Sequence, residues 1–295
     1  MLRYRKFDKE SDYDIMRSIL QHNCMKTGHL YPQLHIGNLD FERYSFEESP
    51  DILYKTAWLI SDEKMEIGFI TIQEEEFFIT VLSEFRHLTN NILDYIEGKC
   101  FMSRTTITTE ANSKDKFLSI ILKERGYIKT DYFRFCGICD LSKIQLYPPL
   151  PGGFIIRLTQ RKDVARRVEL FPIAAGGRGT TLERYERMMN SPSYGDAMDF
   201  VVETINEEII AYCTIWDDPL SKTAILEPVA CVEKYRRKGI MKSTLLYGMN
   251  LLKERGTKFI YVGTGGKNSA SQALYKSVGF LEYGANYEWQ KSLKY

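Results

Sequence analysis

The stretch that decides the fold is residues 224–246, Ala-Ile-Leu-Glu-Pro-Val-Ala-Cys-Val-Glu-Lys-Tyr-Arg-Arg-Lys-Gly-Ile-Met-Lys-Ser-Thr-Leu-Leu. Residues 224–232 are mostly apolar and predict a β-strand, while residues 233–240 are polar and basic and contain Gly239. After this turn the apolar residues recur at helical spacing, at Leu245, Leu246, Met249 and Leu252. The stretch therefore predicts a strand, a basic turn and a helix that begins near Met241.

The basic turn has the properties of a phosphate-binding site. The first N–H groups of a helix have no partner within the helix and attract anions, and Gly239 lets the backbone approach a phosphate closely. Positive charge comes from Lys234, Arg236, Arg237, Lys238 and Lys242. The turn matches neither the Walker nor the Rossmann pattern. The residues alone favour a phosphate or pyrophosphate ligand, with a solvated basic turn as the alternative.

The segment Tyr147-Pro-Pro-Leu-Pro-Gly-Gly153 divides the chain almost in half. Its prolines and glycines exclude a helix or a central strand and predict an interdomain linker. Each half opens with a predicted strand, a polar turn and a helix, and each closes with a helix stopped by Gly126 or Gly279 before a last strand. Gly279 follows Gly126 by 153 residues, which indicates a duplication. We therefore expect two α/β domains, residues 1–146 and 154–295.

The composition is that of an ordinary globular protein, with 44% hydrophobic and 27% charged residues and a net charge of +1. This balance argues against a nucleic-acid partner. No apolar run is long enough for a membrane span and the N-terminus has no signal-like apolar core, so we expect no membrane association and a cytoplasmic location. Cys136 and Cys139 form the one Cys-x-x-Cys pair, with no second pair to complete a zinc site, so no metal is expected.

The charge is distributed unequally. Residues 1–147 contain 19 basic and 23 acidic side chains, whereas residues 148–295 contain 21 basic and 16 acidic ones. We therefore expect an anionic cofactor to bind the second half.

Residues 236–241, Arg-Arg-Lys-Gly-Ile-Met, resemble motif A of the GNAT superfamily of N-acetyltransferases, whose pattern is Arg/Gln-x-x-Gly-x-Gly/Ala. Arg236 and Gly239 match, and Met241 departs from the pattern. Residues 259–280 resemble motif B, in which a strand is followed by an Asn and a helix ending in Leu-Tyr-x-x-x-Gly-Phe. The matching residues are Asn268, Leu274, Tyr275, Gly279 and Phe280. The resemblance implies two tandem GNAT-like domains, each a mixed α/β sheet flanked by helices.

The resemblance also implies acetyl-CoA as co-substrate. Main-chain groups of the strand before the turn would pair with pantetheine, at Val229, Ala230 and Cys231. The turn and the helix start would hold the pyrophosphate, at Arg236, Arg237, Lys238, Gly239, Ile240, Met241 and Lys242. Asn268 would hydrogen-bond pantetheine, cap the following helix, or do both.

Acetyl transfer to an amine needs a base for the amine proton, and the departing thiolate benefits from an acid. The second half contains no histidine. The resemblance implies Tyr275 as the acid and Glu227 as the base or a water-holding carboxylate, with Pro228 marking a bulge in the strand. The alternatives are core packing for Tyr275 and a surface or structural carboxylate for Glu227. Cys231 is not expected to be a nucleophile, because the family transfers the acetyl group directly.

Contacts to the acceptor are predicted from less regular segments. Arg178 lies in the glycine-rich residues 171–180, next to the acceptor pocket of the resembled family, and Trp216 and Asp217 end the strand before motif A. A flexible turn and a hairpin turn are the respective alternatives.

The first half resembles a degraded copy. Leu122 precedes Gly126 by four residues, the position that Tyr275 has before Gly279, and residues 84–91 contain no glycine where the basic turn is expected. We expect this half to support the second or to shape its acceptor site.

The leading interpretation is an acetyl-CoA-dependent N-acetyltransferase for a small-molecule amine, acting as a monomer or homodimer. A non-catalytic CoA-binding regulatory module and a peptide or protein N-acetyltransferase are the alternatives.

Overall fold

The computed structural model describes residues 2–46, 49–100, 105–144, 149–174 and 177–293. Within them, twelve strands form one mixed sheet in the order β1-β2-β3-β4-β5-β12-β6-β11-β10-β9-β8-β7. The strands are β1 (Arg3–Lys6), β2 (Ala57–Ser61), β3 (Glu66–Gln73), β4 (Glu76–Val81), β5 (Thr106–Asn112), β6 (Ile128–Asp140), β7 (Phe154–Leu158), β8 (Met198–Thr204), β9 (Ile209–Asp218), β10 (Thr223–Cys231), β11 (Phe259–Gly265) and β12 (Leu281–Ser292).

The α-helices of the described residues follow the predicted duplication. They are α1 (Glu10–Thr27), α2 (Ile36–Phe41), α3 (Leu53–Thr56), α4 (Thr89–Tyr95), α5 (Lys116–Glu124), α6 (Val164–Ala174), α7 (Leu182–Met189), α8 (Ile240–Glu254) and α9 (Ser269–Ser277). The expected strand, turn and helix at residues 224–246 are confirmed as β10, a short 3-10 turn and α8. No helix among the described residues is long and apolar enough to cross a membrane.

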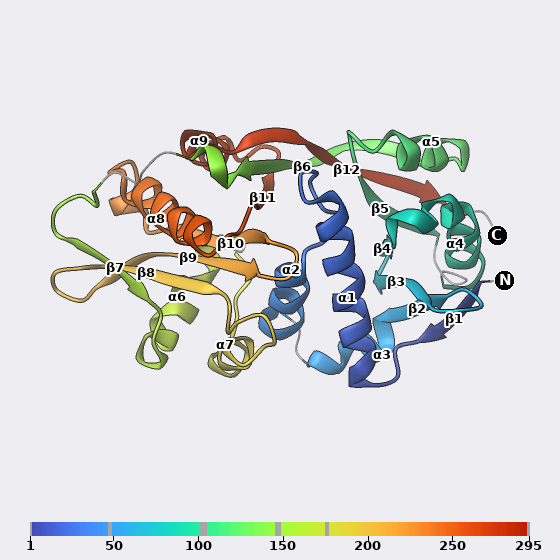
Figure 1. The fold of residues 1–295 in the computed structure, drawn as a ribbon, viewed down its shortest axis with the longest axis horizontal. Coiled ribbons are helices and arrows are strands. Elements are labelled where there is room, and N and C mark those ends of the chain that lie inside the picture. The colour runs from blue at the N-terminus through green and yellow to red at the C-terminus, as the bar shows by residue number, and fades with distance from the viewer. Residues whose placement is uncertain (1, 47–48, 101–104, 145–148, 175–176, 294–295) are drawn as a thin grey trace.

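The last strands of the two halves are exchanged. β6 comes from the first half but pairs with β11 of the second half, and β12 comes from the second half but pairs with β5 of the first. β6 and β12 also pair with each other, antiparallel, and cross between the two halves in Figure 1. The sheet therefore continues across the predicted linker, of which residues 147–148 lie outside the described residues. The division at 147–153 stays a prediction.

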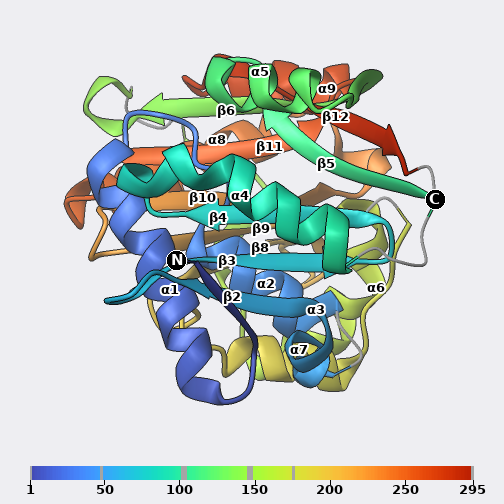
Figure 2. The same ribbon diagram turned by 90° about the vertical axis from the view of Figure 1, so that its right-hand side faces the viewer.

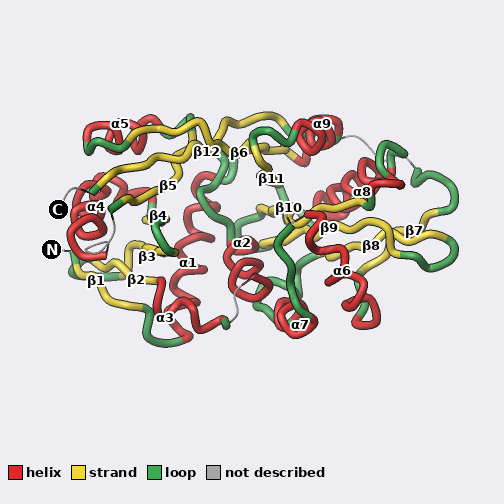
Figure 3. Tube along the Cα trace, turned by 180° about the vertical axis from the view of Figure 1, so that it is seen from behind, coloured by secondary structure: helices red, strands yellow, loops and turns green. Residues whose placement is uncertain are grey.

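Helices cover both faces of each half of the sheet. Successive strand residues point to opposite faces, so Ile215 packs with α8 and α9 while Trp216 packs with α6 and α7. In the first half, Ile70 likewise packs with α4 and α5 while Phe69 packs with α1 and α2. α5 and α9 lie on the same side of β6 and β12, as all three ribbon and tube views show (Figures 1, 2 and 3).

α1 and α2 lie between the two halves (Figures 1 and 3). α2 contacts β9 and β10 of the second half. Gly37 makes this contact possible, because a Cβ atom there would lie 2.2 Å from the Cβ of Trp216. The first half therefore reaches directly onto the strand that carries Glu227.

Candidate active site

The site begins where β10 separates from β11. Their parallel pairing ends at Leu226 and Val262. On its other edge β10 stays paired with β9 through a bulge between Leu226 and Val229, which confirms the irregularity predicted at Pro228. A bulge bends a strand and redirects its side chains. Glu227 lies inside this bulge, at the mouth of the opening between the two strands.

Contacts from two other elements, α2 and β9, hold Glu227. The Asn38 side chain, on α2, donates a hydrogen bond to its carboxylate, and the indole N–H of Trp216 donates to its backbone carbonyl at 2.7 Å. Burial raises the pKa of the Glu227 carboxyl above its usual value, while Arg134, the Asn38 hydrogen bond and Arg178 oppose that rise. A carboxylate with a raised pKa is a stronger base than an exposed one.

Tyr275 faces the same region from α9. Its side chain is 6% exposed and packs edge-on against Phe280, with ring centroids 5.8 Å apart. Burial, and secondarily the charge of Glu227, raises the pKa of the Tyr275 hydroxyl above its usual value. The hydroxyl makes no hydrogen bond within the described residues. Tyr275 therefore keeps its proton and can donate it to a ligand.

The basic turn follows β10 and leads into α8. Gly239 caps the helix in the left-handed conformation, at φ 79°, and a Cβ atom there would meet nothing within 4 Å. No side chain caps the helix start, so its first N–H groups remain open to a ligand. The exposed cations around it are Arg236, Arg237, Lys238 and Lys242. Lys234 instead forms an ion pair with Glu208, at 3.1 Å.

The residues around this turn fit a CoA pyrophosphate. Met241, which departs from the family pattern, is 8% exposed and packs into the core with Ile240, so its side chain does not cover the helix start. The backbone N–H groups of both residues belong to the first turn of α8, where anions bind.

The preceding strand also fits the pantetheine arm. Val229, Ala230 and Cys231 pair with β9 on one edge, whereas the pairing with β11 has already ended on the other. Arg236 donates a hydrogen bond to the carbonyl of Cys231, at 3.0 Å, and so closes the turn. Asn268 caps α9 by accepting from the Ser271 backbone N–H, at 3.1 Å. Its contact with pantetheine stays a prediction.

The residues predicted to contact the acceptor lie in different surroundings. Arg178 is exposed, and its charge acts on Glu227. Trp216 is fully buried behind Glu227 and positions its backbone, so it does not face a ligand. Asp217 is 2% exposed on the opposite face of β9, where it accepts a hydrogen bond from Thr257 at 2.8 Å. Asp217 therefore does not reach the opening at Glu227.

A cavity of about 120 Å³ lies at Glu227, between the two halves. Ile225, Glu227 and Gly263 line it from the second half. Residues of the first half complete the wall, among them Asn38, Glu110 and Arg134, the last from the exchanged strand β6. The first half thus lines this cavity, and its role in shaping an acceptor site stays a prediction.

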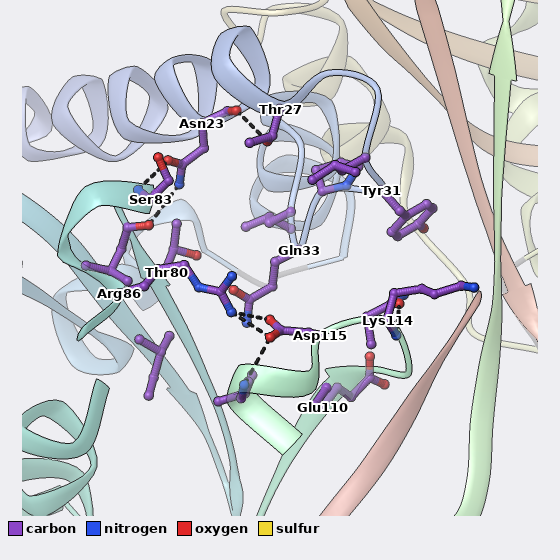
Figure 4. Close-up of a pocket in the computed structure, with 18 of the residues that line it drawn as sticks. Asn23, Thr27, Tyr31, Gln33, Thr80, Ser83, Arg86, Glu110, Lys114 and Asp115 are labelled. Carbon is purple, nitrogen blue, oxygen red and sulfur yellow. Dashed lines mark hydrogen bonds and ion pairs between the residues drawn. The ribbon is translucent and has the colours of Figure 1, made fainter. Parts of the chain in front are cut away.

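A larger cavity of about 430 Å³ adjoins the first and shares Tyr31, Gln33 and Glu110 with it. Figure 4 shows this cavity, with Arg86 and Asp115 pointing toward one another across it. The two Asp115 oxygens accept hydrogen bonds from one nitrogen of Arg86, each at 2.6 Å. This cavity opens between β4 and β5, the strands that correspond to β10 and β11 in the first half.

Sequence reasoning did not identify Asn38, Glu110 or Arg134 as parts of the site. Each lies more than ninety residues before Glu227 in the chain. Only the docking of α2 and the exchange of β6 bring them together, and no local pattern signals either. Among the described residues, no group of three His, Cys, Asp or Glu side chains is arranged to hold a metal ion.

Comparison with known proteins agrees with this geometry. Residues 173–280 match the acetyltransferase (GNAT) family. A tandem GNAT protein from the clavulanic acid biosynthesis pathway, solved without AcCoA, aligns at a TM-score of 0.65 and 14% identity, over 99% of this chain and 98% of that one. A GNAT-family acetyltransferase from Colwellia psychrerythraea aligns at 0.63 and 11% identity, over 99% and 100%.

A GCN5-related N-acetyltransferase from Sphaerobacter thermophilus aligns at a TM-score of 0.62 and 14% identity, over 99% of this chain and 95% of that one. At these identities the solved structures establish the fold alone. No curated protein sequence matches this chain significantly.

Proposed function

We propose that this chain, which contains a GNAT acetyltransferase domain at residues 173–280 and has the tandem GNAT fold over its whole length, transfers an acetyl group from acetyl-CoA to the amine of a small molecule. The observation that carries the proposal is the opening between β10 and β11. Glu227, a half-buried carboxylate, lies at this opening, and Tyr275 on α9 is near enough for the charge of Glu227 to raise its pKa. The helix start of α8, with its open N–H groups, follows the same strand.

The reaction assigns one task to each group. The amine gives its proton to Glu227, directly or through water, and its nitrogen forms a bond to the acetyl carbon. The bond between that carbon and the CoA sulfur breaks, and Tyr275 supplies the proton that neutralises the sulfur. Acetyl-CoA provides the activated acetyl group, and the amides of α8 with the exposed cations of the turn would hold its pyrophosphate.

One chain provides every group that this reaction uses. The halves that line the cavity at Glu227 belong to the same polypeptide. A monomer or a homodimer would therefore serve equally well.

A thiol-release assay with acetyl-CoA and a panel of small amines tests the proposal. We expect turnover with at least one amine, and a rate that rises with pH as Glu227 loses its proton, through a pKa above that of an ordinary glutamate. Glu227→Gln should lower kcat by roughly 10²–10⁴-fold. Glu233→Gln, an exposed carboxylate two residues beyond the end of β10, is the matched control and should leave kcat unchanged.

Two other outcomes favour different functions. CoA binding without turnover on any amine or peptide would favour a regulatory CoA-binding module. Acetylation of peptides in preference to small amines would favour a peptide N-acetyltransferase.

A further inference from the structure

Arg134 lies in the cavity at Glu227 without a binding partner. It sits on β6 opposite Gly265 of β11, and one guanidinium nitrogen lies 3.5 Å from the position that a Cβ atom on Gly263 would take. The side chain is solvent-accessible and lines the cavity. Within the described part of the chain it makes no hydrogen bond and no ion pair. A guanidinium normally binds a carboxylate through two parallel hydrogen bonds, so this one is available to a ligand.

Three carboxylates, those of Glu42, Glu110 and Glu227, line the cavity with Arg134. The other cation in the lining, Arg43, forms an ion pair with Glu10 at 2.8 Å. Glu227 and Glu110 both act on the guanidinium electrostatically, but neither forms an ion pair with it. Glu227 is held by Asn38, and Glu110 accepts a hydrogen bond from Asn286 at 3.4 Å. The cavity therefore presents the guanidinium of Arg134, which has no ion pair within the described residues, and separate carboxylates at Glu227 and Glu110.

A ligand that satisfies these groups must contain both charges. A simple amine or a polyamine would engage the carboxylates but place its own positive charge beside Arg134 with no anion to match it. A purely anionic ligand would engage Arg134 but offer no amine to Glu227. A zwitterion with its carboxylate on Arg134 and its amine at Glu227 matches both signs.

Building on the proposed N-acetyltransferase function, we infer that the acceptor is a free amino acid, whose carboxylate binds Arg134 while its amine faces Glu227. Ile225, Leu34 and Leu39 form an apolar part of the same wall and can pack against an amino-acid side chain. The exchange of β6 is essential to this site, because it carries Arg134 from the first half of the chain to the edge of β11.

Matched pairs of acceptors test the inference. Leucine with isoamylamine, phenylalanine with phenethylamine, and lysine with cadaverine each differ by the carboxylate alone. In the thiol-release assay, kcat/KM should be about 100-fold higher for the best amino acid than for its decarboxylated partner, since hydrogen bonds to charged groups contribute on this scale.

Arg134→Gln should abolish this difference. We expect it to lower kcat/KM for the amino acid about 100-fold relative to the matched amine, because the lost charge changes the Glu227 pKa equally for both acceptors. Lys129→Gln removes a cation from the same strand outside the cavity and should change neither value. Thermal melts of both variants separate loss of the fold from loss of recognition.

Equal use of amino acids and decarboxylated amines, or an equal loss of both in Arg134→Gln, overturns the inference and leaves the proposed function standing. If no amine is acetylated, the proposed function fails instead. Calorimetric titration of the CoA-loaded protein with the same amino acids then tests Arg134 by itself. Binding that Arg134→Gln weakens supports the carboxylate site, and binding that it does not affect, or no binding at all, overturns it.

Discussion

The ionisation of single side chains decides what the cavity can do. Glu227 and Tyr275 both have raised pKa values because they are buried, but the consequences differ. A carboxylate with a raised pKa accepts a proton more readily, whereas a phenol with a raised pKa retains the one it has. Burial therefore prepares both a base at Glu227 and an acid at Tyr275.

Burial also raises the pKa of Glu76, which takes no part in the proposed chemistry, and there the raised pKa makes the stability of the fold depend on pH. Burial, with the charges of Glu110 and Glu288, raises its pKa to about 7. The folded chain therefore binds a proton that the unfolded chain releases at lower pH, so stability is highest below the ordinary glutamate pKa and falls as the pH rises toward 7. Glu76→Gln should remove this loss. The decrease in the free energy of unfolding from pH 5 to pH 8 should then be about 1–2 kcal/mol smaller in the variant than in the unmodified chain.

Urea unfolding at the two pH values measures the difference. Glu75→Gln, an exposed neighbour, is the control and should follow the unmodified chain. Identical pH dependence in the Glu76→Gln and unmodified proteins would refute the assignment.

The sequence indicated Glu227 and Tyr275 because each lies in a segment that resembles a GNAT motif. Asn38, Glu110 and Arg134 lie in no such motif. Their positions depend on which surfaces pack together, and local pattern carries no information about that packing. Trp216 is the instructive case, because an aromatic residue at a strand end suggested a ligand contact and instead lies behind Glu227 as a fully buried support.

Among the elements, the turn before α8 is the feature that distinguishes the two halves. Gly239 precedes α8 in the second half. Arg86 holds the equivalent position in the first half, because it lies 153 residues earlier and Gly126 and Gly279 are separated by the same spacing. Arg86 pairs with Asp115, the residue that caps α5 as Asn268 caps α9. An ion pair in the first half thus occupies the positions that we propose bind CoA in the second.

Gly239→Ala tests the turn. The left-handed conformation costs a residue with a Cβ roughly 1–2 kcal/mol, so the turn should shift and the Kd for CoA should rise about tenfold. Gly256→Ala is a matched control, because Gly256 follows the other end of α8 at φ 86° with equally open space. It should show the same loss of stability without a change in CoA affinity, and a rise in Kd in both variants would contradict the role of the turn.

The same calorimetric titrations measure stoichiometry. We expect one CoA per chain, because the Arg86–Asp115 ion pair and the absence of a glycine at residues 84–91 disfavour a second pyrophosphate in the first half. Two CoA molecules per chain would contradict this.

For the whole molecule, the exchange of β6 and β12 joins the two halves into one sheet. The sequence indicated the duplication and the mixed α/β class, because glycine stops and strand–helix order repeat along the chain. It did not indicate the exchange. The alternation of residues in a strand determines which face is buried, but not which neighbouring strand it pairs with.

The exchange predicts how the protein unfolds. Each half depends on a strand from the other, so neither half of the sheet stays complete when the other half unfolds. Differential scanning calorimetry should therefore give one cooperative transition, with equal calorimetric and van't Hoff enthalpies. Two resolved transitions would show that the halves are independent.

The most direct measurement of the proposed acetyl transfer is thiol release by Tyr275→Phe, at saturating acetyl-CoA with the best acceptor. The hydroxyl makes no hydrogen bond within the described residues, so its removal should preserve the fold and the Kd for CoA. We predict that kcat falls roughly 10²-fold or more, because the departing sulfur loses its proton donor. An unchanged kcat, at equal CoA affinity, would contradict the assignment of Tyr275 as the acid and of this opening as the site of transfer.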